Sequence, residues 1–349
     1  MLVADINLTK LRDNITRLKG EIGDANFCAV VKADAYGHGM KRISISANEL
    51  VQEFAVATFD EALELCSYGI TKPINLLSNV DRSWIDKRRS RTFPQNIIPA
   101  ICDIGEVEYL NKDIKNVNIK LNTGMNRIGV RPQNLRKLIS DLKKKGYNIK
   151  SIYTHFFNPK CPIDTAKQFY EYQRCILPYK SCGFSFHISS SNFLHLSNTM
   201  PDILQMNTVR FGLAMYGYSE ITTPIMEVYT NILQVFNVKK GEHISYGNYL
   251  APYDCKIAAI RVGYADGYRR KDLESLREVE INGVRCPVMG QVCMDITLVD
   301  VSKTRLKGND KVFLIGRQIK MEDLMNSYQT IPYEILTSFG PRLKRNYIK

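Results

Sequence analysis

A lysine ends a short apolar run near the amino terminus. The run Phe27–Val31 is rich in small and β-branched residues, which is typical of a strand covered on both faces, and Lys32 follows it directly. An ammonium group at the mouth of a buried strand is costly to desolvate and is driven toward its neutral form. A neutral amine is a nucleophile that can form a Schiff base with an aldehyde. A strand-end lysine that extends its charge to solvent is the simpler alternative.

Two glycine-containing turns could bind an anion. Residues 36–39, Tyr-Gly-His-Gly, follow Lys32, and residues 211–217 follow Arg210. In such turns the backbone amides can approach a phosphate closely. Glycine turns are also common for purely structural reasons.

A third cluster, residues 120–129, contains two cations. Strand alternation places Lys120 and Asn122 on one face, and the turn at Gly124 could return Arg127 beside them. Two neighbouring cations repel, so the site favours an anion between them, either a cofactor oxygen or a carboxylated lysine. The alternative is an exposed Lys and Arg on a loop.

The elements that must position these residues alternate between short apolar runs and amphipathic segments. This pattern is typical of βα units around a parallel sheet. Eight candidate strands indicate a closed N-terminal (β/α)8 TIM barrel over residues 8–225, in which working groups lie where strands end. The runs are Phe27–Val31, Phe54–Ala57, Ile74–Leu77, Ile97–Ile101, Val117–Leu121, Ile149–Tyr153, Phe184–Ile188 and Met206–Arg210. At or just after their ends lie Lys32, Lys120, Asn122, Arg127, His155, His187, Ser191, Arg210 and Gly212.

After about residue 225 the pattern changes to β-branched segments separated by turns. We expect a mostly-β second domain over residues 226–349 plus 1–7. Asn282-Gly283 predicts a hairpin, and Met321–Tyr328 and Tyr333–Phe339 are expected to be short helices.

Composition limits the other possibilities. The 349 residues are 44% hydrophobic, contain no apolar run of membrane-spanning length and begin without a secretory signal, so we expect a cytoplasmic protein. The nine cysteines form no Cys-x-x-Cys pair and the five histidines are not at ligand spacing with them, so no metal is expected. The net charge of +13 is spread along the chain, which favours a solvated surface over a nucleic-acid site.

Together these residues resemble the alanine racemases, pyridoxal 5'-phosphate (PLP) enzymes built from a barrel and a β domain. The resemblance extends from residue 26 to 347. Val-Lys-Ala-Asp-Ala-Tyr-Gly-His-Gly at 31–39 is a specific signature, and it is followed in order by Gly-Met-Asn-Arg at 124–127, Tyr-Ala-Asp-Gly at 264–267 and Cys-Met-Asp at 293–295.

The resemblance implies an isomerase that interconverts L- and D-alanine by two bases and supplies D-alanine for peptidoglycan. Lys32 would hold PLP and act on the D-enantiomer, and Tyr246 of the other subunit of a homodimer would act on the L-enantiomer. A phenol is a poor base at neutral pH because its reference pKa is about 10, so His155 would assist Tyr246.

The resemblance also implies the surrounding site. Arg210 would face the pyridine nitrogen and, unable to give up its proton, would leave the ring neutral. Arg127 would bind the cofactor's phenolic oxygen and the substrate carboxylate, with help from Met294. Lys120 corresponds to a lysine that is often carbamylated. The cofactor-binding residues would also include Tyr36, His155, Ser191, Gly212, Leu213 and Tyr347, and the entrance would contain Tyr264, Tyr347 and Arg270.

Several positions depart from the family pattern. Ser190 stands where Asn is common, Asn122 replaces a frequent Asp, and the segment 342–347 lacks a proline. A serine or broad-specificity amino-acid racemase is an alternative within the same fold, although Tyr347 favours a small substrate. A PLP decarboxylase of similar architecture is another, although that class has a carboxylate where Arg210 stands. Non-enzymatic alternatives are a PLP carrier and a basic nucleic-acid-binding protein.

Overall fold

The computed structural model describes residues 1–78, 93–188, 206–270 and 277–349, which divide into two units. One unit contains residues 11–35 and 40–222, and the other contains residues 1–10, 36–39 and 223–349. No helix among the described residues is long and apolar enough to cross a membrane.

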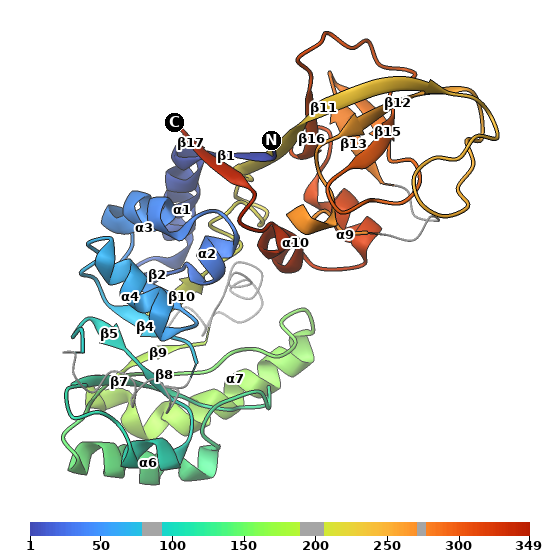
Figure 1. Cartoon of the computed structure of the whole chain (residues 1–349). Coiled ribbons are helices and arrows are strands. Elements are labelled where there is room, and N and C mark those ends of the chain that lie inside the picture. The colour runs from blue at the N-terminus through green and yellow to red at the C-terminus, as the bar shows by residue number, and fades with distance from the viewer. Residues whose placement is uncertain (79–92, 189–205, 271–276) are drawn as a thin grey trace. The chain divides into compact units, whose positions relative to one another are not determined.

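The first unit is built on parallel strands that correspond to the eight predicted runs (Figure 1). One sheet has the order β10-β2-β3-β4-β5 and the other β6-β7-β8-β9. β5 and β6 are consecutive pieces of one run interrupted at Pro99, and the Asn207 amide bonds the Phe186 carbonyl at 3.0 Å between β9 and β10. The predicted barrel is confirmed. Its strands are β2 (Asn26–Val30), β3 (Glu53–Val56), β4 (Ile74–Leu76), β5 (Ile97–Ile98), β6 (Ala100–Ile101), β7 (Asn116–Lys120), β8 (Asn148–Tyr153), β9 (Ser185–His187) and β10 (Thr208–Phe211).

Helices of this unit follow the apolar periodicity of the chain. In α6 the buried residues are Leu135, Leu138, Ile139 and Leu142, the spacing of one helical face. α4 begins with a reciprocal capping box between Thr58 and Glu61, which satisfies amide groups of the first turn. The helices are α1 (Leu8–Ile22), α3 (Met40–Ala47), α4 (Phe59–Ser67), α6 (Leu135–Lys144) and α7 (Pro162–Ile176).

The glycine turn predicted at residues 36–39 is present, with φ of 80° at Gly37 and 91° at Gly39, and the residues before it have an unpredicted conformation. Four consecutive non-glycine residues, Ala33 to Tyr36, have φ between 52° and 54°, so α2 (Lys32–Tyr36) contains a left-handed turn. This conformation costs about 1–2 kcal/mol per residue because Cβ crowds the following carbonyl. Carboxylates offset part of that cost: Glu61 accepts a bond from the Ala33 amide at 2.7 Å, and Asp34 accepts one from the Met40 amide at 2.7 Å.

Removing the Glu61 carboxylate should therefore destabilise the segment that carries Lys32. The same side chain also accepts bonds from the Ala57 amide at 2.8 Å and the Thr58 amide at 3.1 Å. We expect Glu61→Ala to lower the free energy of unfolding by about 1–3 kcal/mol, because three amides lose their acceptor. Denaturant titration measures this loss. Glu64→Ala, on the exposed side of the same helix, is the control, and equal effects of the two substitutions would contradict the assignment.

The second unit is a mostly antiparallel eight-stranded sheet. Along its main path the strand order is β14-β13-β16-β11-β1-β17, and β12 joins β11 to β15. The predicted Asn282-Gly283 hairpin is confirmed, with φ of 52° and 82° at the two turn residues. The strands are β1 (Val3–Asn7), β11 (Met226–Val238), β12 (Cys255–Ile260), β13 (Glu278–Ile281), β14 (Val284–Pro287), β15 (Thr297–Asp300), β16 (Lys311–Ile315) and β17 (Lys344–Ile348).

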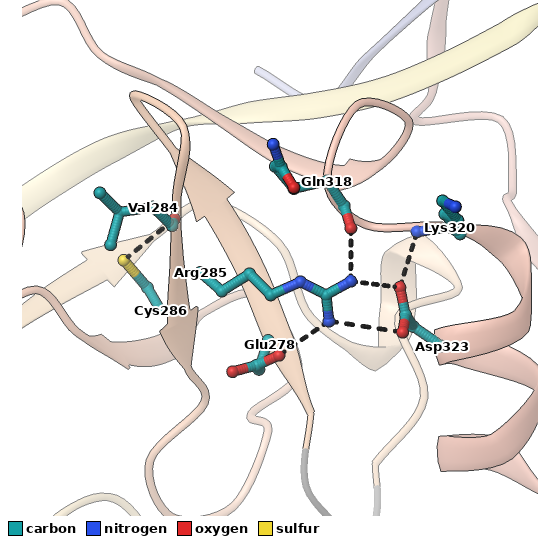
Figure 2. A network of polar contacts seen from close by, with 7 residues as sticks. All are labelled: Glu278, Val284, Arg285, Cys286, Gln318, Lys320 and Asp323. Atoms are coloured by element: carbon teal, nitrogen blue, oxygen red, sulfur yellow. Dashed lines mark hydrogen bonds and ion pairs between the residues drawn. The ribbon is translucent and has the colours of Figure 1, made fainter.

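The two predicted short helices are present in this unit as α9 (Met321–Tyr328) and α10 (Pro332–Ser338). Figure 2 shows that Arg285 of β14, in the β13–β14 hairpin, bonds Asp323 of α9. Its guanidinium lies 2.9 Å from a carboxylate oxygen of Glu278 and 2.9 Å from one of Asp323. Because both pairs are partly exposed, each contributes about 0–1 kcal/mol, and their main effect is to fix the orientation of α9.

Candidate active site

Lys32 lies where β2 ends and is half-buried. Burial lowers the pKa of Lys32, the positive charge of Arg127 lowers it further, and Glu61 opposes these effects. The lowered pKa increases the neutral, nucleophilic fraction of the amine at a given pH. The structure therefore favours the chemical interpretation of Lys32 over a lysine that extends freely to solvent.

Lys120 is buried at the end of β7, with only 6% of its surface exposed. Its Nζ donates a hydrogen bond to the Leu77 carbonyl at 2.9 Å. Burial is the main cause that lowers the pKa of Lys120 to about 8, and the charges of Arg127 and Arg210 contribute. In the part of the chain that the structure describes, no carboxylate pairs with this amine. Lys120 is thus a second amine whose pKa is lowered, so a larger fraction of it is neutral at a given pH than in an exposed lysine.

The loop between β7 and the following helix presents Arg127 on its exposed side. Asn122 organises this loop: its Oδ1 accepts bonds from the amides of Gly124 at 3.3 Å and Asn126 at 3.0 Å. The loop closes where the Val130 amide bonds the Lys120 carbonyl at 2.8 Å. The positive charge of Arg127 lowers the pKa of Lys120, in keeping with the two neighbouring cations expected from the sequence. It also lowers the pKa of Lys32 and His155, which were not part of that expectation.

Arg210 is the most buried cation of the group, with 4% of its surface exposed at the end of β10. Its Nη2 donates to the Thr154 carbonyl at 2.8 Å, and its Nη1 bonds Nδ1 of His187. The guanidinium lies over the Tyr153 ring at 5.2 Å from the centroid. Burial and the Arg210 charge lower the pKa of His187, so the imidazole is neutral and acts as an acceptor. His187, one of the polar residues expected at a strand end, is buried and bonds Arg210.

His155 follows β8 and is half-buried. Burial lowers the pKa of His155 to about 3, with further contributions from Arg210, Arg127, Lys120 and Lys32. A neutral imidazole results, which can accept a hydrogen bond from a hydroxyl group. The backbone carbonyl of His155 is held by Gln168 Nε2 at 2.8 Å.

The second unit brings together the predicted residues of the β domain. Ser245 Oγ donates to the Gln291 carbonyl at 2.6 Å, which fixes the loop of Tyr246 beside residues 290–294. The Tyr264 amide bonds the Cys293 carbonyl at 3.0 Å. Tyr246 is 69% exposed, and Tyr264 and Met294 are exposed as well. Arg270 Nε bonds Gln291 Oε1 at 3.2 Å.

The candidate phosphate-binding residues are distributed over both units. Tyr36 is buried and its ring packs on Tyr333, and Tyr347 donates from its hydroxyl to the His38 carbonyl at 3.2 Å. In the barrel unit, the turn after β10 is held by bonds from the Met215 and Tyr216 amides to the carbonyls of Gly212 and Leu213. Ser191 lies outside the described residues.

Glu61 is a functional candidate that sequence reasoning missed. It bonds the residue directly after Lys32 and influences the Lys32 pKa. The Thr-x-x-Glu spacing at Thr58 is a capping-box signature that could have identified its role in the helix. Its contact with the Lys32 segment joins residues far apart in sequence and has no local signal.

Comparison with known proteins identifies the family. The model of the alanine racemase N-terminal domain matches residues 6–220, and that of the C-terminal domain matches residues 225–347. The alanine racemase of Thermodesulfovibrio yellowstonii is 34% identical, and the alignment covers 99% of this chain and 98% of that protein. The alanine racemase of Clostridium tetani is 32% identical, and the alignment covers 99% of this chain and 95% of that protein. The solved structure of alanine racemase from Clostridium difficile 630 superimposes with a TM-score of 0.90 at 29% identity, and the match covers 99% of this chain and 95% of that chain. These matches span both units and confirm the predicted fold class and enzyme class. The chain belongs to the alanine racemase family, a group of isomerases.

Proposed function

We propose that this protein interconverts L- and D-alanine with PLP as cofactor and supplies D-alanine for peptidoglycan precursors. The observation that carries the proposal is a half-buried Lys32 with a lowered pKa at the end of β2, together with a buried Arg210 on the neighbouring strand β10 that bonds neutral acceptors. A visible absorption spectrum with and without borohydride, followed by a chiral assay on L-alanine, tests it. Absence of both a reducible chromophore and D-alanine would contradict it.

The residues present fit PLP. Lys32 supplies an amine for the cofactor aldehyde, and Tyr36, Gly212, Leu213 and Tyr347, with Ser191, are the proposed phosphate-binding residues. When bound, PLP supplies a conjugated ring that accepts electron density from the substrate Cα. Arg210 is a permanent donor and cannot transfer its proton to a ring nitrogen. This keeps the ring less electron-withdrawing than a carboxylate partner would, and so favours return of the proton to Cα.

Racemisation requires proton removal on one face of the planar Cα and delivery on the other. We assign Lys32 Nζ to the face that acts on D-alanine and the Tyr246 hydroxyl to the face that acts on L-alanine. His155 supports Tyr246, because a neutral imidazole accepts a hydrogen bond from the phenol. Arg127 and the backbone of Met294 hold the substrate carboxylate.

We propose that Tyr246 and Met294 serve the site of a partner subunit in a head-to-tail homodimer. Both are exposed in the single chain, together with Tyr264, Leu250 and Tyr253 of the same unit. Exposed aromatic and methionine side chains are typical of protein interfaces. A shared site makes dimerisation a condition for activity.

Lys120 is the proposed site of carbamylation. Its neutral amine would attack the carbon of CO2 and form an N–C bond, and the nitrogen would release a proton, which replaces a cation by an anion that can bind Arg127. Because the pKa of Lys120 is about 8, its neutral fraction and hence the rate of carbamate formation increase as the pH rises through that value.

Labelled bicarbonate provides the test for Lys120. We expect a 13C NMR signal from the carbamate in the wild type, and none in Lys120→Ala, whose turnover should fall about tenfold because Arg127 loses its anion. Lys137→Ala removes an exposed lysine of the same unit and should keep the signal. A signal that persists without Lys120 would refute the assignment.

Tyr264, Tyr347 and Arg270 are the proposed entrance residues, and the two tyrosines would limit the substrate to a small side chain. A serine or broad-specificity racemase is the second candidate, favoured by an Asn122 that organises the Arg127 loop in place of a charged residue. Relative rates on alanine, serine and lysine distinguish the two candidates. Release of carbon dioxide would indicate a decarboxylase.

A further inference from the structure

A line of hydrogen-bonded polar side chains connects Arg210 to a carboxylate elsewhere in the barrel. Each of six strands contributes one side chain, and all of them except the half-buried last one are buried. In order they are Arg210 (β10), His187 (β9), Ser151 (β8), Asn118 (β7), Asn75 (β4) and Glu53 (β3). Buried polar groups are costly unless they are fully paired, so a continuous line of this kind specifies the position of every member.

The first half of the line determines the tautomer of His187. Ser151 Oγ donates its single proton to Asn118 Oδ1 at 2.7 Å. It must therefore accept the bond from His187 Nε2, which lies 3.0 Å away. With its proton on Nε2, the ring has a lone pair on Nδ1, and this lone pair faces Nη1 of Arg210.

The second half ends on the carboxyl group of Glu53. Burial raises the pKa of Glu53, and the bond from Asn75 and the charge of Arg210 oppose this rise. Asn118 Nδ2 donates to Asn75 Oδ1 at 2.7 Å, and Asn75 Nδ2 donates to Glu53 Oε2 at 2.7 Å. Every bond from Arg210 to Glu53 thus points the same way, and successive bonds in such a chain polarise one another. Glu53 also raises the pKa of Arg210, against the larger effect of burial, which lowers it.

We propose that Ser151, Asn118, Asn75 and Glu53 form a positioning relay that holds His187 in its Nε2–H tautomer and gives Arg210 a distant counter-charge. Among the described residues no carboxylate bonds the guanidinium directly, and the relay fixes its orientation through neutral groups. Its relevance to catalysis rests on the proposed function, because Arg210 is the residue that would face the cofactor ring. The tautomer itself does not depend on that function.

Loss of Ser151 changes the balance of hydrogen-bond donors and acceptors around His187. If Ser151 is lost, the Nε2–H of His187 is left buried without its acceptor, which is costly and weakens the preference for Nε2–H that the Arg210 donor also imposes. The proton can then move to Nδ1, where it would face an N–H group of Arg210. Two opposed donors repel, so the guanidinium would leave its position. Because no step of substrate binding uses these residues, the loss should affect kcat more than KM.

The tautomer is measured directly by 15N NMR of the histidines in the apoprotein, with His187 assigned from a His187→Asn variant. We expect neutral His187 protonated on Nε2 in the wild type and in Ser151→Thr, which keeps the hydroxyl. We expect loss of that single tautomer in Ser151→Ala. Ser44→Ala removes a buried hydroxyl bonded to the Met40 carbonyl at 2.7 Å, outside the line, and is the matched control.

Steady-state kinetics and visible spectra of the PLP-bound enzyme complete the test. Ser151→Ala should lower kcat about tenfold with little change in KM and should shift the visible absorption band, and Ser151→Thr should restore both. Glu53→Gln keeps the acceptor oxygen and removes only the charge, so it should keep the tautomer and shift the absorption band.

A wild-type His187 protonated on Nδ1, or a Ser151→Ala protein with an unchanged tautomer, would overturn the proposal. Failure of the racemase assignment would instead leave the NMR result intact and abolish only the kinetic one.

Discussion

Lys32→Ala should abolish both the borohydride-reducible absorbance of the protein and its turnover. The substitution removes the amine proposed to hold PLP and also the base that acts on D-alanine, so we expect activity to fall by about 10⁴-fold or more. No neighbouring amine replaces it directly, because Lys120 is buried and bonded to the Leu77 carbonyl. Spectroscopy and a chiral assay on both enantiomers measure the two losses separately.

Two further variants control this result. Lys32→Arg keeps a positive charge but is not a nucleophile at accessible pH, so it should be as inactive as the alanine variant. Lys41→Ala removes an exposed lysine that lies over the Tyr68 ring at 5.3 Å, and it should keep wild-type activity. Retention of full activity by either Lys32 variant would refute the role of this residue.

The barrel could be predicted from sequence because its strands are covered on both faces. Such strands are short apolar runs, and their ends coincide with the positions where polar residues begin. Lys32, Lys120 and Arg210 each end or follow such a run, so their placement at one end of the barrel follows from the parallel arrangement alone.

The left-handed turn at Ala33–Tyr36 could not be predicted in this way. Alanine and tyrosine have no local preference for positive φ. Here the conformation is stabilised by two contacts with residues outside the turn: the Ala33 amide donates to Glu61, and the Met40 amide donates to Asp34. The relay had no sequence signal either. Asn75 and Asn118 are single polar residues within apolar strands, and their pairing is visible only when β4 and β7 are placed.

The roles in the site came from the family resemblance, not from spacing. His187 illustrates the difference: its position at a strand end made it a candidate without a defined role, and its contact with Arg210 is visible only in the structure. Tyr246 is the opposite case. The sequence indicated only a tyrosine in a turn, and its exposure in the single chain is consistent with the proposal that it acts in the site of a partner subunit.

Tyr246→Phe should separate the two faces of the reaction. Loss of the phenol removes the proposed base for L-alanine, so racemisation from either enantiomer should fall by about 10³-fold. Lys32 remains able to remove the Cα proton of D-alanine, so exchange of that proton in deuterated solvent should continue at a rate near that of the wild type. Tyr229→Phe, which removes a hydroxyl bonded to Asp5 at 3.4 Å in the same unit, is the control. Equal loss of exchange from both enantiomers would contradict the two-base assignment.

Mixing the two inactive variants tests whether the site is shared between subunits. If Tyr246 acts in the partner's site, a heterodimer of Lys32→Ala and Tyr246→Phe chains contains one intact site and one that lacks both groups. Random reassociation makes half of the dimers mixed, so about one quarter of the wild-type activity should return. If each chain instead used its own Tyr246, the mixture would contain no intact site and would stay inactive. Because each outcome follows from counting bases per site, the result identifies which chain supplies the phenol.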